Sequence, residues 1–422
     1  IYQVDAAGEN WQLLPYNPDA PGLDWNGFTD IVKNGDNLVI SDGSSPWYST
    51  DGGLSWSPSA LEGFGSFYNF PQLNLAGDKV FAYAPFHDFS APFQRSTSGG
   101  AVFEQPQALY DQFGAIAYSY VFDAGRIYSL GLENKINRSD DAAEHWQILS
   151  DSIPFDAIGQ DWLPSSMNSF LVAGNTILIF DYYGTTGKGL VSNNLGGTWQ
   201  IVDFSTNGGY PWGQYGFNTL KSVGNKLIAA TQNAILLSTD GGLSWTNWDD
   251  GLPGFWEATL EIHDGYLWAG LNGGGIWKRP LSDLGLLTAT GTVFNDLNIN
   301  GIHDAGEPGL PDLIVQSTLS NAYTTTNPDG TYALFTSNAD ETIEVVPPAA
   351  YWTASPATQT VSLPAGDLNF ALSVDPSAKD LSVSLVNASP FQPGFETNLT
   401  LFWRNEVPGP ASDVVLSLSF PS

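Results

Sequence analysis

One eight-residue segment occurs twice in the chain, letter for letter: Ser49–Trp56 and Ser238–Trp245 both read Ser-Thr-Asp-Gly-Gly-Leu-Ser-Trp. Weaker copies stand at 139–146, 192–199 and 96–103, and segment 3–11 reads as a copy with one extra residue. In the shared frame Ser-x-Asp-x-Gly-x-x-Trp, an Asp or Asn oxygen can accept backbone N–H groups of its own turn, Gly supplies a positive φ, and Trp is an apolar anchor. The frame, called the box here, predicts a tight turn between two strands.

A second repeat accompanies the box. Six short apolar strands each follow a polar turn that contains a glycine, at Gly35, Gly77, Gly125, Gly174, Gly224 and Gly265. One unit of both repeats spans roughly 40 to 54 residues, the length of a four-stranded propeller blade. The last unit has no box, and the chain opens with a degenerate one. We therefore expect an all-β fold: a six-bladed β-propeller over 1–282 closed by the N-terminal strand, or seven blades if residues precede Ile1, followed by small β-sandwich modules.

The box resembles the Asp-box of sialidase-type, BNR-like β-propellers. The resemblance covers residues 1 to about 282. It implies that the acidic or amide residue of each box holds a turn and takes no part in chemistry, because the box lies away from the functional site in families that carry it. The structural box residues are Asp51, Asp141, Asn194 and Asp240.

The charge is strongly acidic, with 44 Asp and Glu against 13 Lys and Arg and a net charge of −31. A nucleic-acid or anionic-membrane binder needs a basic face, which so few cations cannot build. Cations, neutral glycans and other proteins are the partners that this charge favours. The chain has no cysteine and no apolar run of about 18 residues, so we expect neither disulfides nor a membrane-spanning segment.

The arginine content argues against a sialidase. Such an enzyme holds its substrate carboxylate with three arginines, whereas the propeller region contains only Arg95, Arg126, Arg138 and Arg279. Two of these directly precede a box serine. We predict no catalytic residues. The alternative is a secreted glycoside hydrolase or lectin acting on a neutral polysaccharide, which would need two carboxylates about 5 to 9.5 Å apart; the candidates are Asp24, Asp30, Asp111, Asp156 and Asp161.

Aromatic side chains are frequent in the segments that lead into the first strand of each blade, on the side where propellers usually place ligands. They can stack on sugar rings or contact a polypeptide, or they can pack between blades. The candidates for ligand binding are Trp25, Phe67, Tyr110, Trp162, Trp212 and Trp256.

Segment 296–307 has the spacing of a calcium-binding loop. With Asp296 as position 1, the ligand positions 3, 5, 7, 9 and 12 are occupied by Asn298, Asn300, the Ile302 carbonyl, Asp304 and Glu307, and Gly301 is at the sharp bend. The flanking segments read as strands, which favours a structural clamp over a sensor that opens a helix pair. We predict that Ca²⁺ binds here.

Residues 283–376 resemble the calcium-binding B-type module of serine-aspartate-repeat surface adhesins, through this loop and the later segment 326–332. Residues 377–422 alternate apolar and polar side chains and resemble the start of an immunoglobulin-like module of large secreted Bacteroidota proteins. The module order implies a secreted or cell-surface bacterial protein, exported by a type IX-like route. We expect a non-enzymatic adhesin or a subunit of a surface appendage, with glycans, other cell surfaces or further copies of the chain as partners.

Overall fold

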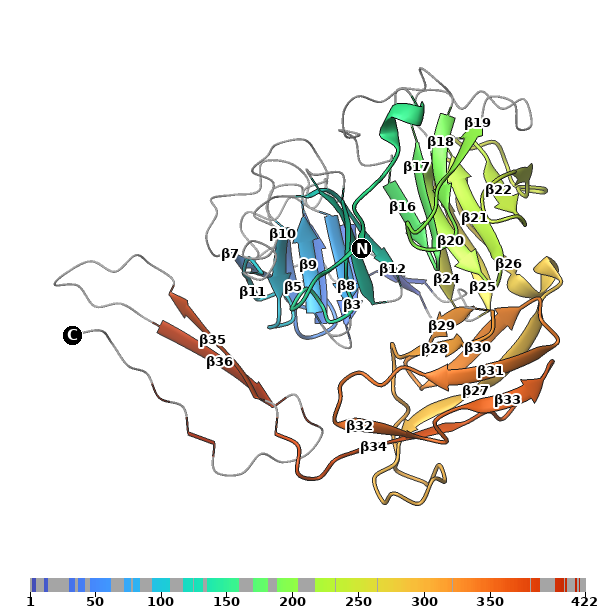
Figure 1. Ribbon diagram of the computed structural model, residues 1–422. Coiled ribbons are helices and arrows are strands. Elements are labelled where there is room, and N and C mark those ends of the chain that lie inside the picture. The colour runs from blue at the N-terminus through green and yellow to red at the C-terminus, as the bar shows by residue number, and fades with distance from the viewer. Residues whose placement is uncertain are drawn as a thin grey trace.

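The computed structural model describes residues 2–4, 11–13, 30–34, 37–41, 46–61, 72–76, 79–83, 93–106, 117–123, 125–131, 135–158, 170–180, 188–203, 217–231, 233–263, 265–320, 322–379, 381–387, 399–405, 407, 414–415 and 417 (Figure 1). Its helices in these ranges are two short 3-10 turns, η1 (Phe155–Ile158) and η3 (Leu281–Leu284). The rest of the regular structure is β, as the sequence predicted. No helix in the described ranges has the length and apolar character needed to cross a membrane.

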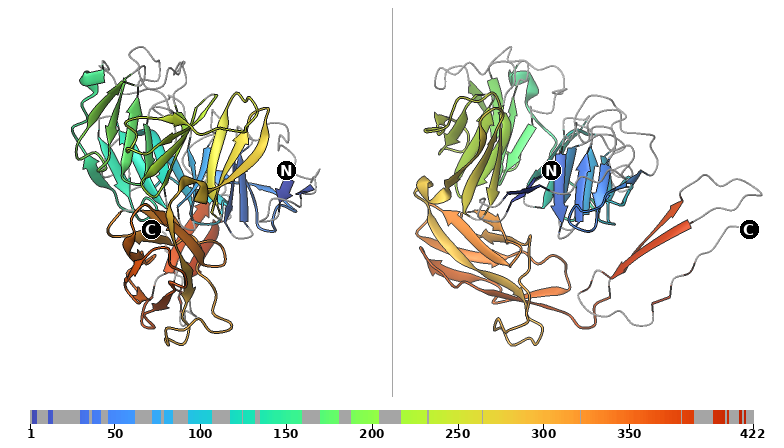
Figure 2. Two further views of the ribbon diagram at one scale, coloured as in Figure 1. Left: turned by 90° about the vertical axis from the view of Figure 1, so that its right-hand side faces the viewer. Right: turned by 180° about the vertical axis from the view of Figure 1, so that it is seen from behind.

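Six small sheets follow one another along the chain and form the propeller-like part (Figures 1 and 2). The first three contain β3 (Asp30–Asn34), β4 (Asn37–Ser41), β5 (Pro46–Ser49) and β6 (Ser57–Pro58); β8 (Gln72–Ala76), β9 (Lys79–Tyr83) and β10 (Phe93–Ser96); and β12 (Ala117–Asp123), β13 (Arg126–Gly131), β14 (Ile136–Ser139) and β15 (Gln147–Ser150). Two short strands, β7 (Ala60–Leu61) and β11 (Val102–Phe103), pair in parallel beside the second sheet.

The last three sheets contain β16 (Phe170–Ala173), β17 (Thr176–Phe180), β18 (Lys188–Ser192) and β19 (Gln200–Asp203); β20 (Phe217–Val223), β21 (Lys226–Thr231), β22 (Ile235–Ser238) and β23 (Thr246–Asn247); and β24 (Ala258–His263), β25 (Tyr266–Leu271) and β26 (Gly275–Pro280). The first strand of each sheet contacts the first strand of the next. The cores lie between neighbouring sheets: Leu178 of the fourth sheet and Leu236 of the fifth pack around the buried Trp245.

The box turns are held by side-chain hydrogen bonds, and Asp51 Oδ1 accepts the Ser55 N–H at 2.9 Å, as the sequence suggested. Ser49 Oγ accepts the Gly53 N–H at 2.8 Å and donates to Asp51 Oδ1 at 2.8 Å, and Trp56 Nε1 donates to the Gly53 carbonyl at 3.1 Å. The copy at 238–245 repeats all three bonds at the same distances. Hydrogen bonds from Ser55, above all from its side chain, lower the pKa of Asp51 to about 2. The serine and aspartate therefore satisfy the turn's N–H groups, and the tryptophan fixes it to the core.

The two N-terminal strands pair with each other. β2 (Trp11–Leu13) pairs with β1 (Tyr2–Val4), with Gln3 opposite Gln12. The fifth sheet shows the usual register of a box, in which the residue before the serine pairs with the residue after the tryptophan. There Leu237 is opposite Thr246. Val4 thus takes the serine position, seven residues before Trp11, so this copy has no extra residue. In the described ranges no fourth strand pairs with β26, and closure by the N-terminal strand stays a prediction.

Two four-stranded sheets form a β-sandwich after η3. One has the order β30-β27-β34-β32 and the other β29-β28-β31-β33. Apolar side chains of both sheets fill the space between them, Val293, Phe370, Val315 and Ile343 among them. The strands are β27 (Leu287–Asn295), β28 (Ile314–Ser317), β29 (Tyr323–Thr325), β30 (Thr331–Thr336), β31 (Asp340–Val345), β32 (Trp352–Ser355), β33 (Gln359–Ser362) and β34 (Phe370–Val374); a hairpin of β35 (Leu381–Asn387) and β36 (Leu399–Asn405) follows.

The box at 139–146, which is the third along the propeller sheets, shows whether a box turn requires glycine. Its Ala142 has a φ of 55°, at the position where the first box has Gly52 with a φ of 71°. A left-handed conformation costs an L-residue about 1–2 kcal/mol. We expect Ala142→Gly to raise the free energy of unfolding by about 1 kcal/mol, and Gly52→Ala, whose new Cβ meets no atom within 4 Å, to lower it by a similar amount. Urea unfolding of both variants is the measurement; shifts of the same sign would contradict this account.

Candidate functional site

The β-sandwich contacts one end of the propeller sheets. Since the strands are antiparallel, the turns between first and second strands lie at the same end as the box turns, and the lead-in segments lie at the opposite end. β28, β29 and β30 lie at the end of β20 and its neighbours (Figures 1 and 2). The sandwich therefore contacts the turn end of the third to sixth sheets, and their lead-in end faces away from it.

A buried carboxylate and a tyrosine lie at the centre of this contact. The hydroxyl of Tyr323, the first residue of β29, lies 2.6 and 2.7 Å from the two oxygens of Asp123, the last residue of β12. The Gly174 N–H, in the turn after β16, is 3.0 Å from Asp123 Oδ2 and 3.1 Å from the Tyr323 oxygen. Ser222 of β20 donates to the same oxygen at 3.2 Å. One tyrosine thus joins three successive propeller sheets.

Backbone and apolar contacts extend the contact toward the fifth and sixth sheets. A Cβ on Gly224, which has a φ of +59°, would lie 2.8 Å from the Phe335 carbonyl oxygen of the sandwich, so only glycine fits at that turn. Lys226 Nζ donates to the Leu284 carbonyl at 2.5 Å. Val223 packs in one cluster with Leu284 and Phe335. The linker helix η3 and the sandwich therefore share a core with the propeller.

Burial has the largest effect on the pKa values of Asp123 and Tyr323. It raises the pKa of Asp123 above the usual 3.8, against the hydrogen bonds from Tyr323 and Gly174 and the nearby charges of Lys221 and Arg126. Burial and the Asp123 carboxylate together raise the pKa of Tyr323 well above 10. Because protonation of Asp123 is easier in the folded state, its contribution to stability is complete below pH 3.8. That contribution is lost as the pH rises through the raised pKa.

The loop 296–307 is folded around its own carboxylates. Asp296 Oδ1 and Oδ2 accept the N–H groups of Asn300 and Gly301 at 3.1 and 2.7 Å, and Glu307 Oε1 and Oε2 accept those of Leu297 and Asp304 at 2.9 and 3.0 Å. The final carboxylate thus reaches back across the loop to its first turn.

Some of the predicted ligands in the loop 296–307 are arranged as a calcium site requires, and others are not. Asp296 and Glu307 are only 4% and 9% exposed, and no Lys or Arg pairs with either in the described ranges. Two buried carboxylates on one loop fit the oxygen ligation of Ca²⁺. Asp304, however, accepts the amides of Asn298 and Asn300 at 2.8 and 2.7 Å, and no cluster of three acidic or histidine groups poised for a metal forms in the described ranges. Calcium binding through Asp296, Asn298, Asn300, Ile302, Asp304 and Glu307 stays a prediction.

The predicted aromatic ligand residues can be located at one position. Trp256, in the lead-in segment of the sixth sheet, is 65% exposed. The other five, Trp25, Phe67, Tyr110, Trp162 and Trp212, lie outside the described residues.

The four propeller arginines all have structural partners. Arg95 donates to Glu144 at 2.6 Å and to the Ala142 carbonyl, and so ties the second sheet to the third box. Arg126 and Arg138 both pair with Asp140. Arg279 pairs with Asp283 at 3.2 Å and lies over the Trp248 ring. Each of the four arginine side chains is thus held by a neighbour in the propeller-like part.

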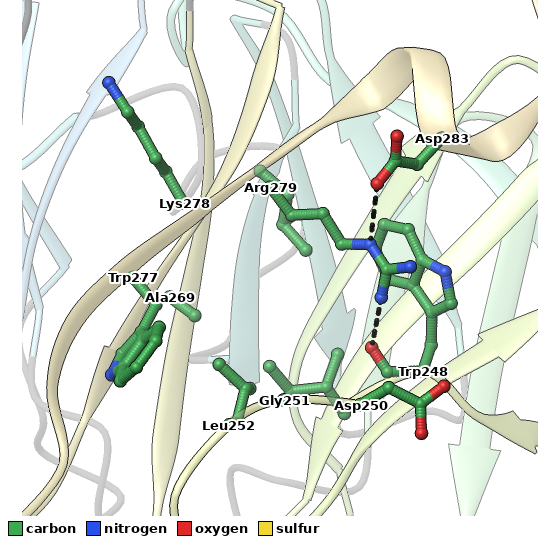
Figure 3. Close-up of a pocket in the computed structure, with 11 residues that line it drawn as sticks. Trp248, Asp250, Gly251, Leu252, Ala269, Trp277, Lys278, Arg279 and Asp283 are labelled. Carbon is green, nitrogen blue, oxygen red and sulfur yellow. Dashed lines mark hydrogen bonds and ion pairs between the residues drawn. The ribbon is translucent and has the colours of Figure 1, made fainter.

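A pocket of about 340 Å³ lies between the fifth and sixth sheets (Figure 3). Its apolar wall contains Ile235, Leu267, Ala269 and Trp277. Arg279 lies at its side, between Asp283 and the Trp248 carbonyl (Figure 3). Sequence reasoning did not find this pocket, because its walls come from two sheets.

Comparisons with known proteins do not assign the chain to a family. No family model and no curated protein matches it. Solved structures that resemble it are β-propeller-like proteins. YCF48 bound to a D1 peptide is 15% identical with a TM-score of 0.42, and the match covers 65% of this chain and 83% of that one. The extracellular domain of a putative one-component system from B. thetaiotaomicron is 12% identical with a TM-score of 0.41, covering 81% and 51%.

The buried pair at the contact gives a pH-dependent prediction. Asp123→Asn keeps an acceptor for Tyr323 and removes the ionisation. We compare the free energy of unfolding of the unsubstituted protein with that of the variant. The unsubstituted protein should lose stability relative to the variant as the pH rises from 3.8 to the raised pKa of Asp123. The loss should be about 1.4 kcal/mol for each pH unit between these two values. Denaturant unfolding between pH 3.5 and 7 measures this difference.

A matched control is Tyr332→Phe, which loses a neutral bond to the Leu368 carbonyl inside the sandwich. This variant should stay parallel to the unsubstituted protein over the whole pH range. Parallel profiles for Asp123→Asn as well would show that the carboxyl does not titrate differently in the folded state.

Proposed function

We propose that this protein is a non-enzymatic extracellular protein of a bacterial surface, an adhesin or a subunit of a secreted appendage. The Asp-box propeller is its recognition or assembly head. The B-type sandwich, with calcium bound at 296–307, is the first segment of its stem, and the immunoglobulin-like segment 377–422 continues the stem. Neutral glycans or polypeptides on other surfaces are the ligands that the acidic charge favours.

The docking of the sandwich is the observation that carries this proposal. Tyr323 and the Gly224 turn fix the sandwich to the turn end of the sheets. The lead-in end therefore points away from the stem, and the one described lead-in candidate, Trp256, is largely exposed there. An exposed indole at the outer end of a fixed head is suited to stacking on a sugar or packing against a polypeptide. The structural use of all four propeller arginines supports binding rather than sialidase chemistry.

The loop provides a separate line of support. Asp296 and Glu307 accept backbone N–H groups but pair with no cationic side chain in the described ranges, so a bound cation would stabilise these buried carboxylates further. Bound Ca²⁺ would supply that positive charge, and the loop is anchored to the last strand of the sandwich, since the Asp296 N–H donates to the Leu372 carbonyl at 2.8 Å. Calcium would thus stabilise the stem segment directly.

Calcium should raise the melting temperature of the full chain. At a concentration of 100 Kd, the ion adds about 2.7 kcal/mol to the free energy of unfolding. Glu307→Gln should remove most of this gain, while Asp367→Asn, an exposed carboxyl of the same sandwich, should keep it. Calorimetric titration and thermal melts with calcium or chelator are the measurements; a melt that is indifferent to both would refute the site.

Binding to glycan arrays and to whole bacterial or algal cells tests the head. Trp256→Ala should weaken any specific binding on the order of tenfold or more, because exposed aromatic anchors dominate such contacts. Trp403→Ala, which removes another largely exposed indole, on the C-terminal hairpin, should leave it unchanged. Equal losses in both variants, or binding to nothing on either panel, would contradict a recognition role for the lead-in end.

A further inference from the structure

Three aliphatic side chains of the loop 296–307 are largely exposed. Leu297, Ile299 and Ile302, called the loop patch here, are 63%, 65% and 62% exposed. The backbone of Ile299 has a φ of 58°, a left-handed conformation that disfavours a β-branched residue and suits Asn or Gly. A strained aliphatic residue beside two other exposed ones indicates that these side chains contact a surface outside the loop.

The loop patch lies at the end of the sandwich that is remote from the propeller (Figure 1). β27 begins next to η3, runs through the sandwich and leads into the loop. β34 runs parallel to β27, with Asn295 opposite Leu372, and the Asp296 N–H donates to the Leu372 carbonyl at 2.8 Å. The chain therefore leaves the sandwich, after Val374, at the same end as the loop.

A short, folded linker joins the sandwich to β35. The Asp375 N–H donates to the Tyr351 carbonyl of the sandwich at 2.9 Å. The Ser377 N–H then donates to the Asp375 carboxylate at 2.8 Å, and the Ala378 N–H donates to the Asp375 carbonyl at 2.9 Å. Leu381, the first residue of β35, follows three residues after this turn, so its Cα lies within about 11 Å of the Ala378 Cα.

The hairpin after the linker exposes apolar side chains at its near end. Leu381 is 45% exposed and Trp403 is 55% exposed. Leu381 is opposite Asn405, the last residue of β36, and Trp403 is two residues before Asn405, so both side chains lie on one face of the hairpin. This pair, called the hairpin patch here, and the loop patch therefore lie on the two sides of one linker.

The short linker favours the hairpin over other partners of the loop patch. A surface on a short tether is present at an effective concentration in the millimolar range, on the order of a thousand times that of a second copy or another protein at micromolar concentration. The five side chains are exposed in the structure, so their packing together would be a second conformation of the joint.

We propose that the loop patch packs against the hairpin patch and thereby closes the joint between the sandwich and the module that follows it. The movement takes place after Ala378, because the turn that ends there is bonded to the sandwich. Removal of apolar side chains from water drives the closure. This inference goes beyond the proposed function, and it depends neither on calcium, since the loop is held by its own hydrogen bonds, nor on the lead-in end.

Disulfide trapping in the full chain tests the contact, and the cysteine-free sequence supplies no competing thiol. The pair Leu297→Cys and Trp403→Cys should form an intramolecular disulfide under mild oxidation, because the closed joint brings the two Cα atoms within about 7 Å. Adding Ile299→Asn to the same pair should slow this reaction on the order of tenfold, since the loop patch then loses an aliphatic side chain. Mass spectrometry of the oxidised monomer and dimer gives the rates.

Trypsin cleavage after Lys379 is a second measurement, on the chain without added cysteines. Lys379 is exposed and is the only Lys or Arg between Arg279 and Arg404. Ile299→Asn should speed this cleavage several-fold by opening the joint. It should not lower the melting temperature, because Asn tolerates the positive φ. Leu319→Asn, which changes another exposed aliphatic residue of the sandwich, should leave the cleavage rate unchanged.

Three results would overturn the proposal. Equal rates of disulfide formation with and without Ile299→Asn would show that the two cysteines meet only by random motion of the linker. Crosslinked dimers in place of crosslinked monomers would assign the loop patch to a second copy. An unchanged cleavage rate at Lys379 after Ile299→Asn would show that the loop patch does not close the joint. None of these results bears on calcium binding or on recognition by the lead-in end.

Discussion

The propeller-like part depends on a serine hydroxyl that accepts a backbone N–H four residues later. Ser49, Ser96, Ser139, Ser192 and Ser238 all make this bond, at 2.8 to 2.9 Å. It closes the turn between a third and a fourth strand, and the residue at the end of the box then enters the core between two sheets. With short strands and no cysteine, such local bonds fix the register of each sheet, and apolar packing between sheets fixes their succession.

Features that repeat along the sequence could be predicted from it. The box bonds, the six sheets and the β-sandwich after 282 follow from local patterns, because turn chemistry and strand alternation act over a few residues. The N-terminal copy is one residue shorter than the sequence predicts, because it has no serine to mark the start of the box, and the pairing of Gln3 with Gln12 places that start at Val4. Calcium binding at 296–307 stays a prediction, and five of the six aromatic candidates lie outside the described residues.

Contacts between distant segments could not be predicted. Asp123 and Tyr323 are 200 residues apart, and each looks like an ordinary strand-end residue in the sequence. The only signal was indirect: Asp123 precedes a glycine turn, as Ser222 does, and such turns share one end of the sheets. The pocket beside β26 was hidden for the same reason, although the absence of a box after Trp277 was visible in the sequence.

The contact around Tyr323 also determines how tension would travel through the molecule. A pull on the C-terminus of the sandwich reaches the propeller along the covalent path through η3 and β26, and in parallel through the ends of β12, β16 and β20. The second path includes the Asp123 carboxylate, the Gly174 N–H and the packed Gly224 turn, so these contacts would share the load with the covalent path. A head held in this way would shield its last, three-stranded sheet from being peeled off by its own stem.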